Sequence, residues 1–290
     1  MRVFAVEGSA TMAGADASKL RRFADAVARL YRNNPYHNLH HAVDVTNTLA
    51  WLLTRPVWRE RFTPNQTFWM LVAALAHDLD HPGLNNQWEI YNHTERARKY
   101  GNVSILEHHA VDMTRALLER PELQFYGEMT AAQVEEGLML MRELILATDF
   151  AMHRDFLNQL SAALDAKGQA QGAQGLDMLL VAKALIKAAD IANTSRPYAQ
   201  AKVWGLRVMK EFWVQGKLEQ QHGFPVGPFN DPSKINLNQA QAGFIKFAAL
   251  ELFELLARLE PAMDEMVQSL RNNVQLYQES DGQGRASLEE

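Results

Sequence analysis

The sequence predicts an all-α fold, built as one compact multi-helix bundle. Apolar residues recur at spacings of three and four along almost all of the 290 residues, which is the period of an amphipathic helix. No segment shows the clear alternation of a β-strand, and no internal repeat or linker marks a boundary between domains. We therefore expect one domain over residues 18–279, with a flexible extension over 1–17 and a polar tail over 280–290.

The expected helices follow one another along the whole chain. Ser18 is a suitable N-cap for the first helix, which should end before Pro35 because proline cannot continue a helix. The last predicted helix should be interrupted near Pro261 for the same reason. Between them the apolar pattern predicts helices over 41–53, 65–79, 103–119, 131–148, 153–166, 175–192 and 198–215, and the last helix over 239–277.

Two connecting segments differ in composition. Residues 166–175 are rich in Gly, Gln and Ala, which favours a solvated loop without chemistry. Residues 216–237 contain Gly, Pro and Asn together with Phe224 and Phe229. A long loop with aromatic residues is either a lid or a packed surface loop, and the sequence slightly favours the lid.

Composition and charge exclude several classes of protein. A net charge of −5 and a pI near 6.1 give no electrostatic reason to bind nucleic acid or an anionic membrane. The absence of cysteine removes disulfides and zinc–thiolate sites and fits a reducing compartment. The longest apolar runs, such as 68–76, are too short to span a bilayer. We expect a cytoplasmic protein, or a domain of a longer chain, in which metals supply any affinity for phosphate.

Histidine is concentrated near the N-terminus. Eight of the ten histidines precede residue 110, and aspartates accompany them. Imidazole and carboxylate groups without thiolate suit zinc, magnesium or manganese. The pattern indicates a hydrolytic metal centre. The eight are His37, His40, His41, His77, His81, His93, His108 and His109.

The spacing within the cluster supports metal binding. His37 and His41 are four residues apart, so on a helix they share one face. His77 and His81 have the same spacing, and Asp78 lies about 100° round the helix from His77. A single His-x-x-x-His pair is more often packing or surface chemistry, but two pairs followed by Pro-Gly form a strong signal.

A further acidic ligand should come from later in the chain, and Asp190 is the best candidate. It ends an otherwise apolar helix, where a carboxylate costs free energy unless something pairs with it. The alternatives are an exposed helix end or a pair with Arg196. Glu107 and Asp149 raise the same question, and taken alone each fits a surface or capping role.

Seven blocks of sequence carry a further signal. They are Tyr36-His37-Asn38-x-x-His41-Ala42-x-Asp44-Val45, His77-Asp78-x-Asp80-His81-Pro82-Gly83, Asn85-Asn86, Leu106-Glu107, Ala147-Thr148-Asp149, Ala189-Asp190-Ile191-x-Asn193 and Gln241-Ala242-Gly243-Phe244-Ile245. Together they resemble a known family, the class I cyclic-nucleotide phosphodiesterases, and they occur in the family's order. The resemblance covers about residues 20 to 277. One block departs, because the usual Leu-Glu-Asn-His-His is here Leu106-Glu107-His108-His109, which keeps Glu107 and leaves the two histidine roles open.

The resemblance implies a compact α-helical phosphodiesterase domain of the HD type with two divalent ions. It implies a tightly held zinc and a second ion, magnesium or manganese, which Asp78 would share. His37 would be the general acid that protonates the leaving 3′ oxygen. The implied zinc ligands are His41, His77, Asp78 and Asp190, the residues that orient the waters are His81, Glu107 and Thr148, and the residues of the purine pocket are Gln241, Phe244, Val208, Asn193 and Tyr36.

The implied substrate is a small 3′,5′-cyclic nucleotide, hydrolysed to its 5′-monophosphate. Residues 223–229 and 243–247 resemble the cGMP-preferring branches more than the cAMP-specific one. Only about one helix precedes Tyr36, where the family usually has several, so fusion to a regulatory or membrane sensor domain and a homodimer stay open. The alternative functions are a catalytically weak nucleotide-binding domain, another HD-type nucleotide phosphohydrolase and a purely structural helical domain.

Overall fold

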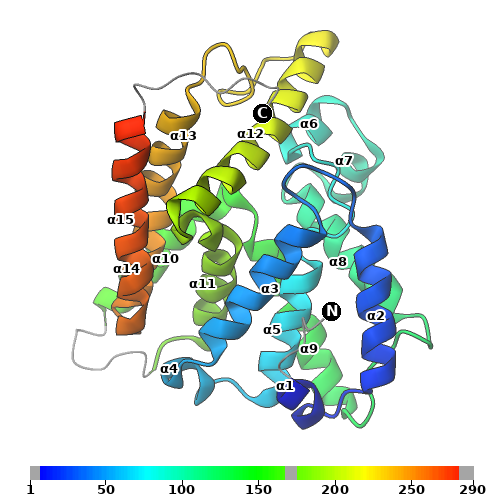
Figure 1. Cartoon of the computed structure of the whole chain (residues 1–290). Coiled ribbons are helices and arrows are strands. Elements are labelled where there is room, and N and C mark those ends of the chain that lie inside the picture. Colours follow the sequence, from blue (N-terminus) through cyan, green and yellow to red (C-terminus); the bar gives the residue numbers. More distant parts are fainter. Residues whose placement is uncertain (1–6, 167–174, 281–290) are drawn as a thin grey trace.

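The computed structural model describes residues 7–166 and 175–280, and every regular element in them is a helix. This confirms the predicted all-α fold (Figure 1). Short 3₁₀ turns η1, η3 and η5 occupy 150–152, 192–195 and 261–263, and a π-helical turn, η4, occupies 245–249. The α-helices are α1 (Glu7–Met12), α2 (Ala17–Leu30), α3 (Leu39–Leu53), α4 (Pro56–Arg59), α5 (Pro64–Ala76), α6 (Asn86–Tyr91), α7 (Glu95–Tyr100), α8 (Ile105–Leu118), α9 (Ala131–Ala147), α10 (His153–Asp165), α11 (Met178–Ile191), α12 (Tyr198–His222), α13 (Leu237–Phe244), α14 (Leu250–Ala257) and α15 (Asp264–Glu279).

Helix α5 lies at the centre of the core. It packs against α3 and α9 (Figure 1), and residues 68–76 are all buried, which explains their continuous apolar run. A Cβ atom on Gly137 of α9 would lie 2.0 Å from Trp69 Nε1. Glycine therefore allows α9 to approach α5 closely. The buried end of α5 leads directly into the His77-Asp78 pair.

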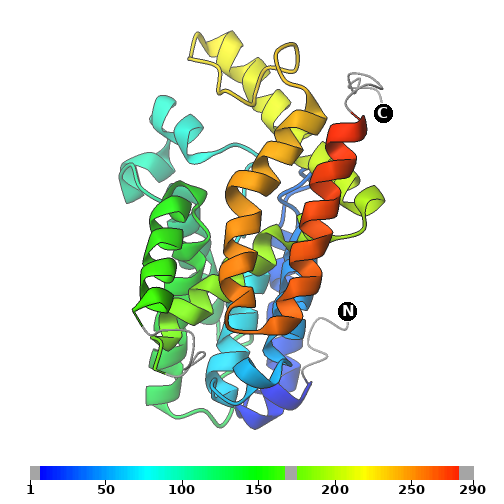
Figure 2. The same ribbon diagram turned by 90° about the vertical axis from the view of Figure 1, so that its left-hand side faces the viewer.

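The C-terminal helices form an antiparallel pair beside this core. Helices α13 and α14, joined through η4, run alongside α15 (Figure 2). Helix α14 ends at Ala257, and α15 begins at Asp264 after Pro261, so the break expected near this proline is confirmed. No helix among the described residues combines the length and the apolar character needed to cross a membrane.

The N-terminal region differs from the expectation of a flexible extension over 1–17. Residues 7–12 form α1, which packs on α5, and Ala10 and Ala13 are buried. The cap of α2 is Asp16 rather than Ser18, because its carboxylate accepts hydrogen bonds from the amides of Ser18 and Lys19. Residues 1–6, the tail from 281 and most of the expected loop, 167–174, lie outside the described residues.

The segments around α12 also differ from the predicted pattern. Helix α12 continues past Gln215 to His222, so part of the predicted loop is helical. Within this extension, Gly216 allows residue 230 to approach the helix closely, since a Cβ atom there would lie 1.9 Å from the Asn230 carbonyl oxygen. The sequence pattern predicts none of the four short helices, α1, α4, α6 and α7, because four to six residues carry too little periodicity.

Candidate active site

The four predicted metal ligands converge from three parts of the chain. His41 is on α3, His77 and Asp78 follow α5, and Asp190 is near the end of α11. His41 Nε2 lies 2.9 Å from Asp190 Oδ1 and 3.6 Å from Asp78 Oδ2. His77 Nε2 lies 3.1 Å from Asp78 Oδ2 and 3.4 Å from Asp190 Oδ1. The structure thus brings together groups that are up to 149 residues apart in the sequence.

The hydrogen bonds around His77 fit a metal ion. Its Nδ1 lies 2.8 Å from the Ala74 carbonyl oxygen, an acceptor, so Nδ1 carries the proton and Nε2 keeps a free lone pair in the neutral ring. That Nε2 atom and Asp78 Oδ2 are buried without a hydrogen-bond partner. In the neutral ring this buried lone pair faces two carboxylates, an arrangement that a bound cation would stabilise. The donor set of two imidazoles and two carboxylates suits zinc.

The charges of these four residues also favour a bound cation. Burial opposes a charge on His77, but Asp78 and Asp190 outweigh it and raise the His77 pKa well above its usual value. Burial would raise the pKa of Asp190, yet hydrogen bonds with His41 and His77 lower it below the usual range. The two carboxylates therefore stay ionised and attract positive charge to the point where the imidazoles meet.

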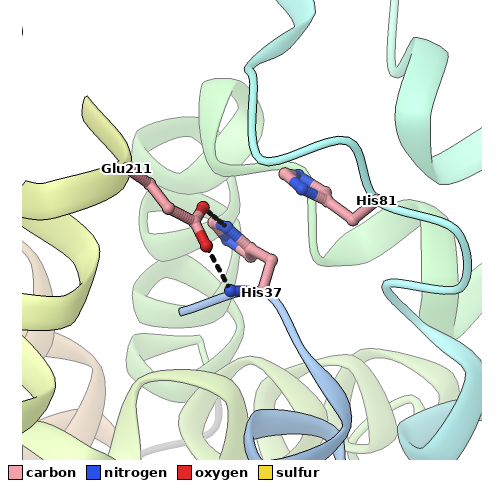
Figure 3. A group of neighbouring side chains, drawn as sticks. All are labelled: His37, His81 and Glu211. Carbon is pink, nitrogen blue, oxygen red and sulfur yellow. Dashed lines mark hydrogen bonds and ion pairs between the residues drawn. The ribbon is translucent and has the colours of Figure 1, made fainter. Parts of the chain in front are cut away.

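A second cluster lies beside the first and contains His37, His81 and Glu211 (Figure 3). His37 Nδ1 lies 2.6 Å from Glu211 Oε2, while Glu211 Oε1 accepts hydrogen bonds from the amides of Tyr36 and His37. The rings of His37 and His81 stack, with centroids 4.0 Å apart. Burial lowers the pKa of His37, but Glu211 outweighs this effect and the pKa rises to about 9.

The hydrogen bonds of this second cluster favour proton transfer over metal binding. The Gly83 amide donates to His81 Nδ1 over 3.0 Å, so Nε2 carries the proton in the neutral ring and offers no lone pair to a metal. Burial and the neighbouring His37 lower the His81 pKa to about 3, which keeps the ring neutral. His37 Nδ1 is already paired with Glu211. The cluster can therefore hold and donate protons.

Sequence reasoning missed Glu211. Its side chain is only 2% exposed, but its sequence neighbours, Lys210 and Phe212, do not indicate that it is buried. Its position three residues after Val208 places both on one face of α12. This helical spacing is the signal that could have identified it.

The two histidines whose alignment was open have separate contacts. His109 Nε2 lies 2.8 Å from Asp80 Oδ2, and Arg32 donates to the other oxygen of Asp80 over 2.7 Å. His108 Nδ1 lies 2.8 Å from the Ser104 carbonyl oxygen, and its ring stacks on Tyr100. His109 thus ties α8 to the segment after α5, and His108 stabilises the start of α8.

Glu107 and Thr148 lie on neighbouring elements. Glu107 accepts a hydrogen bond from Asn86 Nδ2 over 3.0 Å, and Asn86 Oδ1 accepts one from the Leu106 amide over 3.0 Å. Burial, with a smaller contribution from Asp149, raises the Glu107 pKa to about 7. Thr148 caps α9, and its hydroxyl donates to the Ile145 carbonyl over 2.7 Å.

The residues expected to bind the purine line parts of the same region. The Asn193 amide donates to the Tyr36 hydroxyl over 2.8 Å, and the Tyr36 ring lies 4.6 Å from that of His41. Gln241 on α13 is buried against Gly205 of α12, where a Cβ atom would lie 2.7 Å from the Gln241 Cδ. Glycine at 205 therefore makes room for the glutamine.

The two residues expected to sandwich the base belong to different packing clusters. Phe244 packs against the main core, and its ring centroid lies 5.5 Å from that of Phe150. Val208 packs in a smaller cluster built around Met209, Trp213 and Leu237. Phe244 and Val208, which are expected to lie on the two faces of the base, are thus each supported by a different set of neighbours.

The sequence of this chain matches the family of 3′5′-cyclic nucleotide phosphodiesterases over residues 36–270. The chain belongs to this family. The matched region contains both histidine clusters.

Similar family members differ in the nucleotide that their names give. A high affinity cGMP-specific 3′,5′-cyclic phosphodiesterase 9A from Mus musculus is 33% identical over 264 residues, 90% of this chain and 48% of that protein. A probable 3′,5′-cyclic-AMP phosphodiesterase, pde-4, from Caenorhabditis elegans is 32% identical over 254 residues, 86% of this chain and 38% of that protein. This chain therefore spans about half, or less, of the length of these relatives.

Solved structures of the same kind share the fold. The phosphodiesterase domain of the RhoPDE fusion protein from the choanoflagellate Salpingoeca rosetta aligns with a TM-score of 0.90 and 30% identity, covering 97% of this chain and 89% of that one. LmjPDEB1 in complex with IBMX aligns with a TM-score of 0.89 and 31% identity, covering 97% and 85%. These alignments confirm the expected helical architecture.

Proposed function

We propose that this chain hydrolyses a 3′,5′-cyclic nucleotide to its 5′-monophosphate. The observation that carries the proposal is the placement of His41, His77, Asp78 and Asp190 around one point, with the paired His37 beside them. A cation-binding centre next to a protonated imidazole suits the cleavage of a phosphodiester, which needs charge neutralisation and protonation of the leaving oxygen.

The four converging residues would hold a zinc ion, and Asp78 would share a second ion, magnesium or manganese. A pair of such ions supplies an activated water and neutralises the phosphate. The protein's part is to keep both carboxylates ionised and to fix the tautomer of His77 through Ala74. The proposed metal centre thus depends on the backbone at the end of α5.

His37 would be the general acid. Glu211 binds its Nδ1 atom over 2.6 Å, which leaves the proton on Nε2 for donation to the 3′ oxygen. With a pKa of about 9, the ring stays protonated at neutral pH. Once it has donated, it becomes neutral, and Glu211 favours its return to the charged form.

The remaining site residues would orient water and substrate. His81 offers an Nε2 proton, and Glu107 and Thr148 offer polar atoms, for waters around the ions. Gln241 would hydrogen-bond the purine, Phe244 and Val208 would cover its two faces, and Asn193 with Tyr36 would line the pocket.

We propose cGMP as the preferred substrate, with cAMP as the alternative. The relative that is 33% identical is named as cGMP-specific, whereas another is named for cyclic AMP. A glutamine amide can present a donor or an acceptor to either base, so the preference depends on how Gln241 is held. The similarity to the phosphodiesterase domain of a rhodopsin phosphodiesterase supports attachment to a sensor, and we propose that residues 18–279 form a cytoplasmic catalytic domain. A homodimer is the assembly that we propose for it.

Parallel hydrolysis assays with cGMP and cAMP test the proposal, each with and without a chelator. We expect turnover of at least one cyclic nucleotide and its loss with the chelator. If the metal-loaded protein binds cyclic nucleotide without turnover, it is a binding domain instead. Hydrolysis restricted to non-cyclic nucleotides would indicate another HD-type phosphohydrolase.

A further inference from the structure

A buried carboxylate on α12 lies outside the catalytic groups described above. Glu219 is 2% exposed, and its two oxygens accept four hydrogen bonds. Oε1 accepts from Gln215 Nε2 over 2.7 Å and from Asn230 Nδ2 over 3.0 Å. Oε2 accepts from Asn230 Nδ2 and from the Gly227 amide, each over 2.9 Å. A buried carboxylate costs free energy unless donors surround it, so these bonds specify this arrangement.

One set of these donors belongs to the connection between α12 and α13, residues 223–236, which we name the α12–α13 loop. Asn230, itself 5% exposed, and Gly227 attach its middle to Glu219. At its start, the Phe224 ring lies 5.3 Å from that of Tyr91 on α6. At its end, Ile235 packs in the cluster that contains Val208. The loop is therefore attached at its start, middle and end, which fits a packed surface loop better than the lid that the sequence slightly favoured.

The other donor, Gln215, connects Glu219 to residues near the proposed metal centre. Gln215 binds Asn85 twice: its amide donates to Asn85 Oδ1, and its oxygen accepts from the Asn85 backbone, each over 2.9 Å. Asn85 caps α6, and the next residue, Asn86, donates to Glu107. Glu219 thus fixes the orientation of the Gln215 amide and connects the α12–α13 loop to the segment that follows His81.

We propose that Glu219 is a positioning residue for catalysis, which holds the α12–α13 loop and residues 82–86 in one arrangement. Through Ile235 it supports Val208 on one side of the proposed base site, and through Gln215 and Asn85 it supports the segment carrying Asn86. Glu219 touches none of the reacting groups. The catalytic part of this inference rests on the proposed hydrolysis of cyclic nucleotides.

The variant Glu219→Gln tests the inference, because it keeps the shape and turns one acceptor into a donor that faces other donors. We expect backbone hydrogen exchange to accelerate about tenfold or more in 223–236 and 82–91, with α5 and α11 unchanged. The KM for the cyclic nucleotide should rise about fivefold while kcat stays within about twofold. Glu265→Gln, an exposed glutamate on α15, is the matched control and should change neither quantity.

Further variants separate the contact of Glu219 with the α12–α13 loop from its contact with Gln215. Asn230→Ala removes the side-chain contact between the loop and Glu219 but leaves the bond between Gln215 and Glu219 in place, so exchange should accelerate in 223–236 and not in 82–91. Gly216→Ala keeps the carboxylate and raises helix propensity, but its Cβ atom would meet the Asn230 carbonyl and displace the loop. It should therefore raise KM as Glu219→Gln does. Glu219→Asp, which retains the charge, should restore part of the wild-type KM.

The outcomes are distinguishable. Unchanged exchange in Glu219→Gln, or acceleration spread over the whole protein, would overturn the positioning role. Local acceleration with unchanged KM would overturn its link to catalysis. If wild-type protein hydrolyses no cyclic nucleotide while the exchange pattern follows expectation, the proposed function fails and the connection of the two segments by Glu219 stands.

Discussion

His37 and Glu211 are 174 residues apart in the sequence, yet His37 Nδ1 lies 2.6 Å from Glu211 Oε2. The same carboxylate also accepts the amides of Tyr36 and His37 through its other oxygen. One buried side chain of α12 therefore fixes both the backbone and the ring of the proposed acid. The pair has a direct consequence for the pH dependence of the reaction.

Glu211→Gln should lower kcat about 100-fold and move the alkaline limb of the pH–rate profile to lower pH. In the wild type the raised pKa, about 9, keeps His37 protonated below that pH and lets activity fall above it. Without the carboxylate, burial lowers the pKa and the acid loses its proton earlier. Turnover of cyclic nucleotide measured from pH 6 to 10 checks this. An alkaline limb that does not move would contradict the pairing.

His37→Ala should reduce turnover by about 10²–10⁴-fold, the usual contribution of a general acid, without loss of metal. The ring is the proposed proton donor and is not one of the four converging residues His41, His77, Asp78 and Asp190. Steady-state kinetics together with elemental analysis separate the two effects. His40→Ala is the control, since this neighbour belongs to neither cluster, and should retain activity. Unchanged turnover in His37→Ala would remove its role as the acid.

Asp190→Ala should lose the tightly bound zinc. Its carboxylate lies 2.9 Å from His41 and 3.4 Å from His77, so the variant removes one of the two carboxylates that face these imidazoles. Elemental analysis after dialysis should give a zinc content near zero in the variant. Asp80→Asn changes an aspartate that binds Arg32 and His109 instead and should retain zinc. Stoichiometric zinc in Asp190→Ala would argue against ligation.

Gly205→Ala should weaken substrate binding more than it slows chemistry. The added Cβ atom would lie 2.7 Å from Gln241 Cδ, so the glutamine has to move from the position proposed for the base. We expect a KM about tenfold higher with kcat within about threefold. The comparison should be made with both cGMP and cAMP. A normal KM for both would separate Gln241 from base recognition.

Gly137→Ala should destabilise the core by about 1–3 kcal/mol, the cost typical of overpacking. The new Cβ atom would lie 2.0 Å from Trp69 Nε1, whereas a Cβ atom on Gly243 meets nothing within 4 Å. Gly243→Ala is therefore the matched control and should be neutral or slightly stabilising. Urea unfolding measures both. Equal stability of the two variants would contradict the close approach of α9 to α5.

Periodicity and motifs predicted the helical fold and the convergence of His41, His77, Asp78 and Asp190, because helix periodicity is local and the motifs occur as ordered blocks.

The sequence did not predict the burial of Glu211 and Glu219, for a physical reason. Whether an acid on a helix is solvated or buried depends on segments far away in the sequence, such as 36–37 and 227–230. The predicted loop begins at residue 216, whereas α12 continues to His222. Gly216 marks a close contact with residue 230 rather than a helix end, and that contact also depends on a distant segment.

Helix α12 carries contacts to Gln241, His37, Asn85 and Asn230 from residues spread over 205–219. Each of these residues can be replaced alone with a local effect. Inserting or deleting a single residue between them is different, because it rotates everything beyond that point by about 100° and shifts it by about 1.5 Å. The length of this stretch is therefore as strictly constrained as the identity of any side chain in it.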